Sequence, residues 1–179
     1  LGYTNHFTLY DEKDVQRLVS SLVREITGIQ GALPSLEPTF AALTTARNKG
    51  LAAGQIQTTG SEWHDQLTRT LYHQFQVSMR AYNAVDFDHL LTLTVELFNR
   101  FPEVLQKYQE LYRYIMIDEY QDTNPVQYRL AELLSSEHNN LCVVGDDDQS
   151  IYGWRGADIT AILSFPNAEK VTLDQNYRS

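Results

Sequence analysis

Residues 114–124 read YIMIDEYQDTN, and this stretch decides the fold. It begins with a short apolar run and continues directly into two acids, Asp118 and Glu119. Such a pattern is typical of a buried parallel strand that delivers charged groups to the carboxyl edge of a sheet, where α/β proteins bind ligands. One carboxylate there can hold Mg²⁺, and the second can orient or deprotonate a water molecule. The alternative is a strand end that is capped by two solvated acids.

The following residues repeat this arrangement. Asn124 is expected to cap a helix, with Pro125 at the first helical position. A second buried strand is expected at residues 141–144, and it ends at Gly145 before three aspartates and Gln149. Two strands therefore finish in polar residues at one edge of a parallel sheet, which predicts an α/β fold with flanking helices.

Three segments resemble the Walker B region and the two following motifs of superfamily 1 DNA helicases of the UvrD/Rep type. They are DEYQDTN at 118–124, VVGDDDQSIYGWRGAD at 143–158 and LDQNYRS at 173–179. The segments FTLYDEKD at 7–14 and DFDHLLTLT at 86–94 are also similar to parts of that family. The resemblance implies part of a P-loop NTPase sheet of the RecA-like kind, together with an inserted helical subdomain.

The domain boundary is expected near residue 111. Residues 1–111 have almost entirely helical patterns, whereas residues 112–179 alternate strand and helix. In the family, a helical subdomain called 1B is inserted into the first motor domain, 1A. We therefore assign residues 1–111 to a 1B-like subdomain and residues 112–179 to the second half of domain 1A, with the Walker B and following motifs.

The resemblance also implies roles at the nucleotide. Asp118 corresponds to the Mg²⁺ carboxylate and Glu119 to the residue that activates the attacking water. Gln149 resembles the γ-phosphate sensor, although a loop amide that binds backbone would look the same. Arg178 resembles the arginine that stabilises transition-state charge, and Tyr177 resembles the aromatic residue that stacks on adenine.

Three residues are candidates for binding single-stranded DNA. Tyr152 and Trp154 lie two apart in a loop bounded by glycines, where aromatic side chains can stack on bases. Arg155 follows them and can contact a phosphate or the nearby acids. From the pattern alone a buried tryptophan is equally consistent, and the family resemblance favours the DNA role.

The resemblance implies an ATP-dependent DNA helicase that couples ATP hydrolysis, with ATP and Mg²⁺ bound, to translocation on single-stranded DNA and duplex unwinding. Its partners would be single-stranded DNA and single/double-strand junctions, in repair, replication or recombination. The 179 residues contain no G-x-x-x-x-G-K-[ST] phosphate loop. We therefore expect a fragment that is inactive alone and needs the Walker A half of 1A and a second motor domain. The alternatives are the motor subunit of a helicase–nuclease and a non-catalytic protein-interaction module.

Composition restricts the function further. The chain has a formal net charge of −9 and a sequence pI near 4.9, the opposite of a typical nucleic-acid-binding domain. DNA contacts must therefore be local or depend on other parts of the polypeptide. No apolar stretch approaches the roughly 20 residues of a membrane span, and no signal-peptide pattern is present. We expect a cytoplasmic protein without a membrane partner.

Three residues are expected to have structural roles only. Cys142, the single cysteine, lies in a strand pattern and is expected in the core. Trp63 belongs to the apolar stripe of a helix capped by Ser61, and it is also expected in the core. His89 stands where the family usually has a second acid, and it is expected at the surface.

Overall fold

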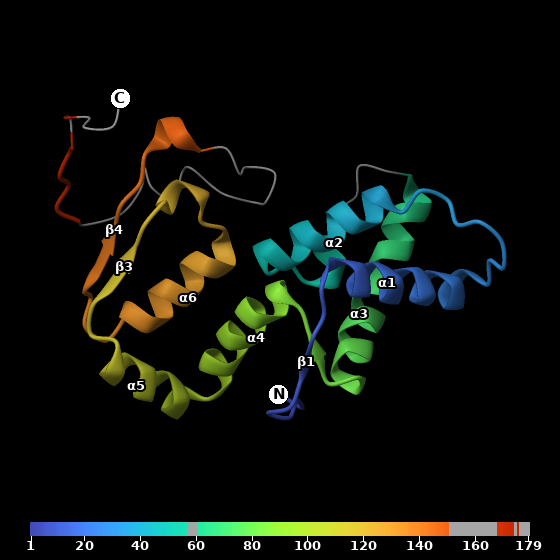
Figure 1. Ribbon diagram of the computed structural model, residues 1–179, viewed down its shortest axis with the longest axis horizontal. Coiled ribbons are helices and arrows are strands. Elements are labelled where there is room, and N and C mark those ends of the chain that lie inside the picture. Colours follow the sequence, from blue (N-terminus) through green and yellow to red (C-terminus); the bar gives the residue numbers. More distant parts are fainter. Residues whose placement is uncertain (57–60, 151–167, 174, 176–179) are drawn as a thin grey trace.

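The computed structural model describes residues 1–56, 61–150, 168–173 and 175 (Figure 1). The helices are α1 Glu12–Thr27, α2 Glu37–Lys49, α3 Glu62–Ala81, α4 Phe87–Arg100, α5 Pro102–Leu111 and α6 Pro125–Ser135. The strands are β1 Thr8–Leu9, β2 Ala84–Val85, β3 Ile115–Ile117 and β4 Leu141–Val143. Three short 3-10 helices are η1 Ala53–Gln55, η2 Tyr120–Asp122 and η3 Asp147–Gln149. The described residues are thus rich in helix, with two small parallel sheets, which confirms the α/β class at this level.

Local signals define both ends of helix α1. Asp11 caps its first turn and forms a capping box with Asp14. Gly28 ends the helix in the left-handed conformation, at φ 69°, which a residue without Cβ adopts easily. The apolar face of α1 packs against α3, and its buried residues Val19, Leu22 and Val23 belong to the main core.

Helix α3 supplies the centre of that core. Leu67, Leu71, Phe75 and Met79 are buried at helical spacing. Trp63 is different, because 39% of its surface is exposed. It lies in the first turn of α3, and its ring meets the edge of the His64 ring at 4.8 Å between centroids. The prediction that Trp63 is a core residue is therefore wrong.

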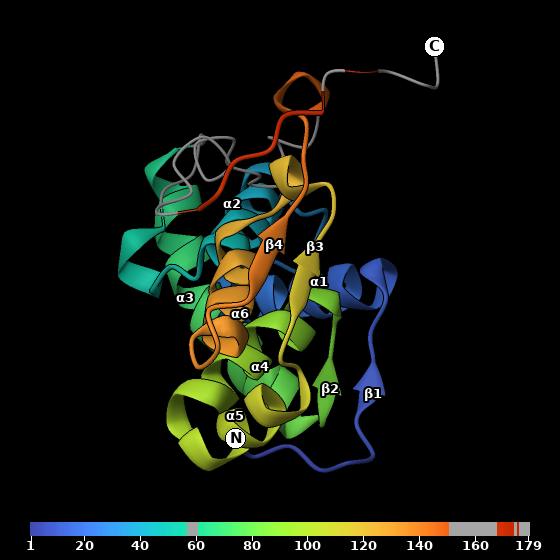
Figure 2. The same cartoon turned by 90° about the vertical axis from the view of Figure 1, so that its left-hand side faces the viewer.

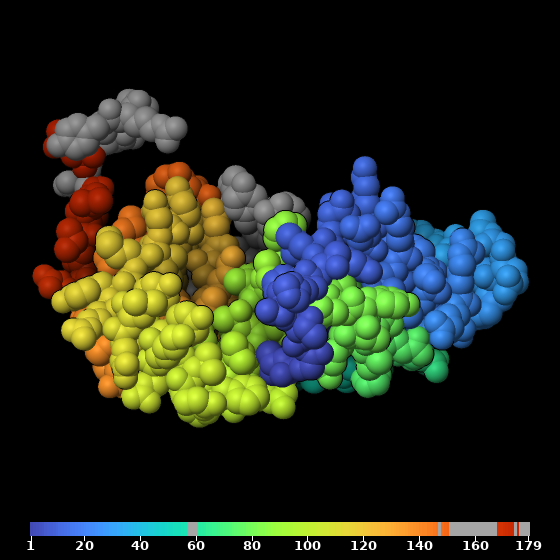
Figure 3. Space-filling view, turned by 60° about the horizontal axis from the view of Figure 1, so that its bottom comes forward, coloured from blue at the N-terminus to red at the C-terminus, as the bar shows by residue number. Residues whose placement is uncertain are grey.

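The two ends of the α1–α3 unit are joined by a short parallel sheet. Thr8 pairs with Ala84 and Leu9 with Val85, so β1 and β2 lie side by side (Figure 2). The N-terminal segment lies against residues near the end of α3, as Figure 3 shows in dark blue and green. The entry and exit of this helical unit are adjacent, which is the arrangement that an inserted unit requires.

The remaining elements surround the second parallel sheet. Strand β3 pairs with β4, with Ile117 opposite Val143, and α6 packs against β3 (Figure 1). Helix α4 contacts α2, α5 and α6, and so connects the α1–α3 unit to the helices beside this sheet. Asn124 caps α6 with Pro125 at its start, as predicted.

The sequence predicts Cys142 in the core, and this prediction is wrong, because one face of the two-stranded sheet is exposed among the described residues. Met116 is 76% exposed and Cys142, opposite it in β4, is also exposed. The residues on either side of Met116 in β3, Ile115 and Ile117, are half-buried. The reason is that side chains alternate along a strand, and α6 covers the side that carries the isoleucines. Among the described residues, no helix is long and apolar enough to cross a membrane.

Candidate functional site

Asp118 and Glu119 lie immediately after β3, at its carboxyl end, and both are exposed. Glu119 has φ 51° and ψ 42°, a left-handed conformation that is uncommon for a residue with a side chain. Asp118 stabilises this turn, because its Oδ1 accepts a hydrogen bond of 2.9 Å from the Glu119 amide. Backbone conformations of this kind concentrate at functional sites, where the surrounding structure enforces them.

The turn after β3 is tied to the end of β4 through the backbone. The Val144 amide donates to the carbonyl oxygen of Ile117 at 2.8 Å, and the Tyr120 amide donates to that of Val144 at 2.9 Å. The acid pair and the residues that follow β4 are therefore at the same edge of the sheet, as the sequence predicts.

A glutamine that sequence reasoning did not select connects the two turns. The Gln121 side chain is 1% exposed, and its Nε2 donates to Glu119 Oε2 at 2.7 Å. Its Oε1 accepts a hydrogen bond of 3.0 Å from the backbone amide of Asp146. No sequence pattern identifies these bonds, because one partner is 25 residues away, across the sheet.

Gln149 belongs to the same hydrogen-bonded group. Its Nε2 donates to Asp146 Oδ2 at 2.6 Å, while Asp146 Oδ1 accepts from the Asp148 amide at 3.0 Å. Gln149, Asp146, Gln121 and Glu119 therefore form one continuous chain of hydrogen bonds from the β4 turn to the β3 turn. We call these four residues the edge chain.

The residue between Glu119 and Gln121 anchors the turn in the core. Tyr120 is 1% exposed, and its ring packs against that of Tyr128 on α6, at 6.5 Å between centroids. Burial, with a smaller effect from Tyr128, raises the pKa of the Tyr120 hydroxyl to about 12. The turn that carries the acids is thus held by a buried neutral tyrosine.

The donor atoms at the sheet edge fit a hard cation. Carboxylate oxygen is a preferred ligand of Mg²⁺, which is usually bound through one or two carboxylates together with phosphates. Asp118 is exposed and has one oxygen occupied by the Glu119 amide. Within the described part of the chain, no group of three or more His, Cys, Asp or Glu side chains is placed to hold a metal ion. One carboxylate from this edge, with phosphate oxygens, is therefore the fitting arrangement.

Five of the predicted site residues lie outside the described residues. They are Tyr152, Trp154, Arg155, Tyr177 and Arg178. Their expected contacts with DNA and nucleotide stay predictions.

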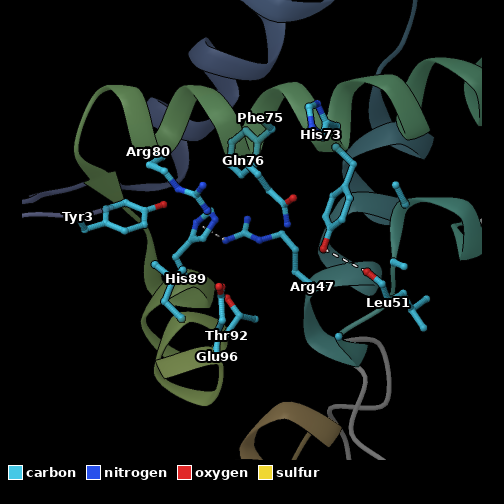
Figure 4. Close-up of a pocket in the computed structure, with 15 residues that line it drawn as sticks. Tyr3, Arg47, Leu51, His73, Phe75, Gln76, Arg80, His89, Thr92 and Glu96 are labelled. Atoms are coloured by element: carbon cyan, nitrogen blue, oxygen red, sulfur yellow. Dashed lines mark hydrogen bonds between the residues drawn. The ribbon is translucent and has the colours of Figure 1, made fainter. Parts of the chain in front are cut away.

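A second polar cluster lies between α2, α3 and α4. His89 is 6% exposed, and its Nδ1 lies 3.0 Å from Asp86 Oδ1. Arg47 forms an ion pair with Asp86, and Figure 4 shows its side chain extending toward His89. The His89 ring also stacks on Phe75, at 5.7 Å between centroids. The prediction that His89 is a surface residue is wrong, because α2 and α3 bury it.

This cluster borders a pocket of about 480 Å³ (Figure 4). Its lining includes Tyr3, Arg47, Tyr72, His73, Arg80 and Glu96. Two carboxylates lie beside Arg47, since Asp86 pairs with it and Asp88 Oδ2 lies 3.5 Å from it. The positive charge of Arg47 is thus balanced within the protein.

Comparison with known proteins identifies the family of the chain. A family model for the UvrD/REP helicase N-terminal domain matches residues 1–170. The chain belongs to the UvrD/Rep helicase family. The ATP-dependent DNA helicase PcrA of Staphylococcus aureus is 41% identical over 183 aligned residues, which cover 100% of this chain and 25% of that helicase. PcrA of Staphylococcus epidermidis is 40% identical with the same coverage. The chain thus spans about a quarter of the length of the curated UvrD/Rep relatives it matches.

Proposed function

We propose that this chain is part of an ATP-dependent DNA helicase that couples ATP hydrolysis to translocation on single-stranded DNA and to duplex unwinding. The observation that carries the proposal is the position of Glu119. It lies at the carboxyl edge of a parallel sheet, beside Asp118, and a buried glutamine holds its carboxylate. Membership of the UvrD/Rep family and 41% identity to an ATP-dependent DNA helicase support it.

In this proposal each residue at the sheet edge has one task. Glu119 orients and deprotonates the attacking water, since a carboxylate oxygen that is free of Gln121 can accept its proton. Asp118 supplies oxygen to Mg²⁺, which when bound neutralises phosphate charge. Gln149 donates its amide to a γ-phosphate oxygen, which a neutral group can do beside several acids. Arg178 stabilises transition-state charge, and Tyr177 stacks on adenine.

The remaining candidates are assigned to DNA. Tyr152 and Trp154 would stack on bases of single-stranded DNA, and Arg155 would contact a phosphate. Local contacts of this kind suit a chain with a net charge of −9, because no broad basic surface is available from its composition. Junctions of single-stranded and double-stranded DNA are the proposed substrate.

We also propose the division into a helical 1B-like unit, residues 1–111, and the second half of a RecA-like domain, residues 112–179. The phosphate-binding loop and the second motor domain would then come from the rest of the polypeptide; in PcrA of Staphylococcus aureus, about three quarters of the length lies outside the matched part. The 179-residue chain alone would not hydrolyse ATP. The reason is that these 179 residues contain no G-x-x-x-x-G-K-[ST] loop, whose lysine contacts the outer phosphates.

The test is ATP hydrolysis by the full-length polypeptide, with and without single-stranded DNA. We expect hydrolysis that single-stranded DNA stimulates, and no hydrolysis by the 179-residue chain alone. A full-length polypeptide that binds single-stranded DNA without hydrolysing ATP would contradict the proposal, and would favour a non-catalytic binding module instead.

A further inference from the structure

The amide of Gln121 is held by two partners that require opposite hydrogen-bonding groups. Glu119 Oε2 accepts from Nε2 at 2.7 Å, and the Asp146 backbone amide donates to Oε1 at 3.0 Å. Reversing the amide would place its oxygen against a carboxylate and its NH₂ against an N–H group. The two partners therefore fix the orientation of the amide, and neither glutamate nor methionine can satisfy both.

Burial makes this arrangement rigid. The Gln121 side chain is 1% exposed, so water cannot replace either bond. Its neighbour Tyr120 is also buried, which fixes the backbone from which the side chain extends. The Glu119 carboxylate, in contrast, lies at the exposed edge, and the backbone of Glu119 is in the left-handed conformation. A rigid buried donor thus holds one oxygen of an otherwise exposed carboxylate.

The same amide reaches the turn that follows β4. Asp146 donates its backbone amide to Gln121, and its Oδ2 accepts from Gln149 Nε2 at 2.6 Å. The Gln149 NH₂ group has two N–H donors, so it can donate to a phosphate oxygen while its other N–H stays on Asp146 Oδ2. A phosphate oxygen bound there is then linked, through Asp146, to Gln121.

We propose that Gln121 is a positioning residue that orients the Glu119 carboxylate for water activation and couples it, through Asp146, to Gln149. This inference rests on the proposed role of Glu119. Gln121 touches no reacting atom and acts through its contacts with Glu119 and Asp146. The edge chain then links phosphate contact at the β4 turn to the orientation of the base at the β3 turn.

The test compares variants of the full-length polypeptide in steady-state ATP hydrolysis with saturating single-stranded DNA. Gln121→Met removes both bonds and keeps a similar volume. We expect kcat to fall about 10- to 100-fold, because misplacing a reacting group by about 1 Å costs up to that much. The KM for ATP should change little, because Gln121 does not touch the nucleotide.

Gln109 provides a matched control. It is also a buried glutamine, 7% exposed, and its Nε2 donates to the Leu133 carbonyl oxygen at 2.8 Å and to Ser136 Oγ at 3.0 Å. These bonds join α5 to α6, away from the sheet edge. Gln109→Met should lower the melting temperature as Gln121→Met does, and leave kcat unchanged.

A second variant keeps the inference testable if Gln121→Met does not fold. Gln121→Glu has nearly the same shape and still accepts from the Asp146 amide, but it places a second carboxylate beside Glu119. Like charges repel, so the Glu119 carboxylate should leave its position, and kcat should fall about 10- to 100-fold while the KM for ATP changes little. A purely structural role for Gln121 would lower stability without lowering kcat.

The outcomes separate the inference from the proposed function. If Glu119→Gln keeps kcat within about tenfold of the unchanged protein, the proposed function fails, whatever the Gln121 variants show. If Glu119→Gln abolishes turnover while Gln121→Met matches Gln109→Met in kcat, the positioning role alone is overturned. An unchanged kcat in Gln121→Glu would overturn it equally.

Discussion

Arg47 of α2 and Asp86, the N-cap residue of α4, form a buried ion pair between residues 39 apart in the sequence. Both side chains are less than one tenth exposed. Asp86 also accepts hydrogen bonds from the His89 amide at 2.9 Å, which caps α4. This pair therefore joins α2, in the α1–α3 unit, to α4, which packs against α6 beside the β3–β4 sheet.

We predict that Asp86→Asn destabilises the protein by about 3 to 5 kcal/mol, because it removes the nearer of the two carboxylates that balance the buried Arg47 charge. Urea denaturation of the full-length polypeptide measures this loss. Glu96→Gln is the control, since Glu96 forms an exposed pair with Arg100 on one helix, at 2.8 Å. Exposed pairs of this kind contribute roughly 0.3 to 0.5 kcal/mol. Equal effects of the two variants would contradict the prediction.

The same pair predicts a dependence of stability on pH. Burial alone raises the pKa of Asp86, but the hydrogen bond with His89 and the charge of Arg47 outweigh burial and hold the pKa well below its usual value of 3.8. A carboxylate with a lowered pKa contributes stability above the unfolded-state value, and that contribution is lost as pH falls toward the folded-state value. We expect stability to decline below about pH 4, less steeply in Asp86→Asn. Parallel curves for both proteins would contradict this assignment.

Asn83 is predicted to hold the short β1–β2 sheet together. Its Nδ2 donates to Thr4 Oγ1 at 2.7 Å and to the His6 carbonyl oxygen at 3.0 Å, and its backbone is left-handed, at φ 49°. Asn83→Ala should cost about 1 to 2 kcal/mol for the backbone alone, and more through the lost bonds. Asn83→Gly should recover the backbone part only.

Hydrogen exchange separates these two contributions. The Thr8 and Tyr10 amides donate to the carbonyl oxygens of Asn83 and Val85, at 2.9 Å and 2.7 Å. We expect faster exchange of both amides in Asn83→Ala and in Asn83→Gly. Unchanged protection in both variants would mean that the side chain does not hold the sheet.

Features defined by nearby residues could be predicted from the sequence. Asp11 and Asn124 cap their helices through residues three positions away, and Gly28 ends α1 by its own conformation. The position of the acids at the sheet edge also follows, because the apolar run and the acids are contiguous. These signals are local, so a single sequence contains them completely.

Features defined by distant residues could not be predicted. His89 is buried by Arg47, which is 42 residues away, and by Phe75 of α3. Gln121 obtains its role from Asp146, in the turn after the neighbouring strand β4. The exposure of Cys142 depends on which sheet face α6 covers, and strand periodicity alone does not specify this.

The DNA assignment predicts a separation of binding from stability. Trp154→Ala in the full-length polypeptide should weaken binding of single-stranded DNA by roughly 1 to 3 kcal/mol, the contribution of one stacked base. Trp63→Ala is the matched control, because Trp63 is 39% exposed and lies at the start of α3. It should leave DNA binding unchanged. DNA titrations and melting curves of both variants measure the two effects, and a loss of stability without a DNA effect at Trp154 would assign it to the core.

The most direct test of the central claim is single-turnover ATP hydrolysis by full-length Glu119→Gln with saturating single-stranded DNA. This variant keeps the shape of the side chain and removes the base. Glu110→Gln is the control, since Glu110 is an exposed glutamate of α5. We predict at least a roughly 100-fold lower rate in Glu119→Gln, with ATP binding retained, and an unchanged rate in Glu110→Gln. A Glu119→Gln rate above about one tenth of the unchanged protein would contradict the assignment of Glu119 as the base.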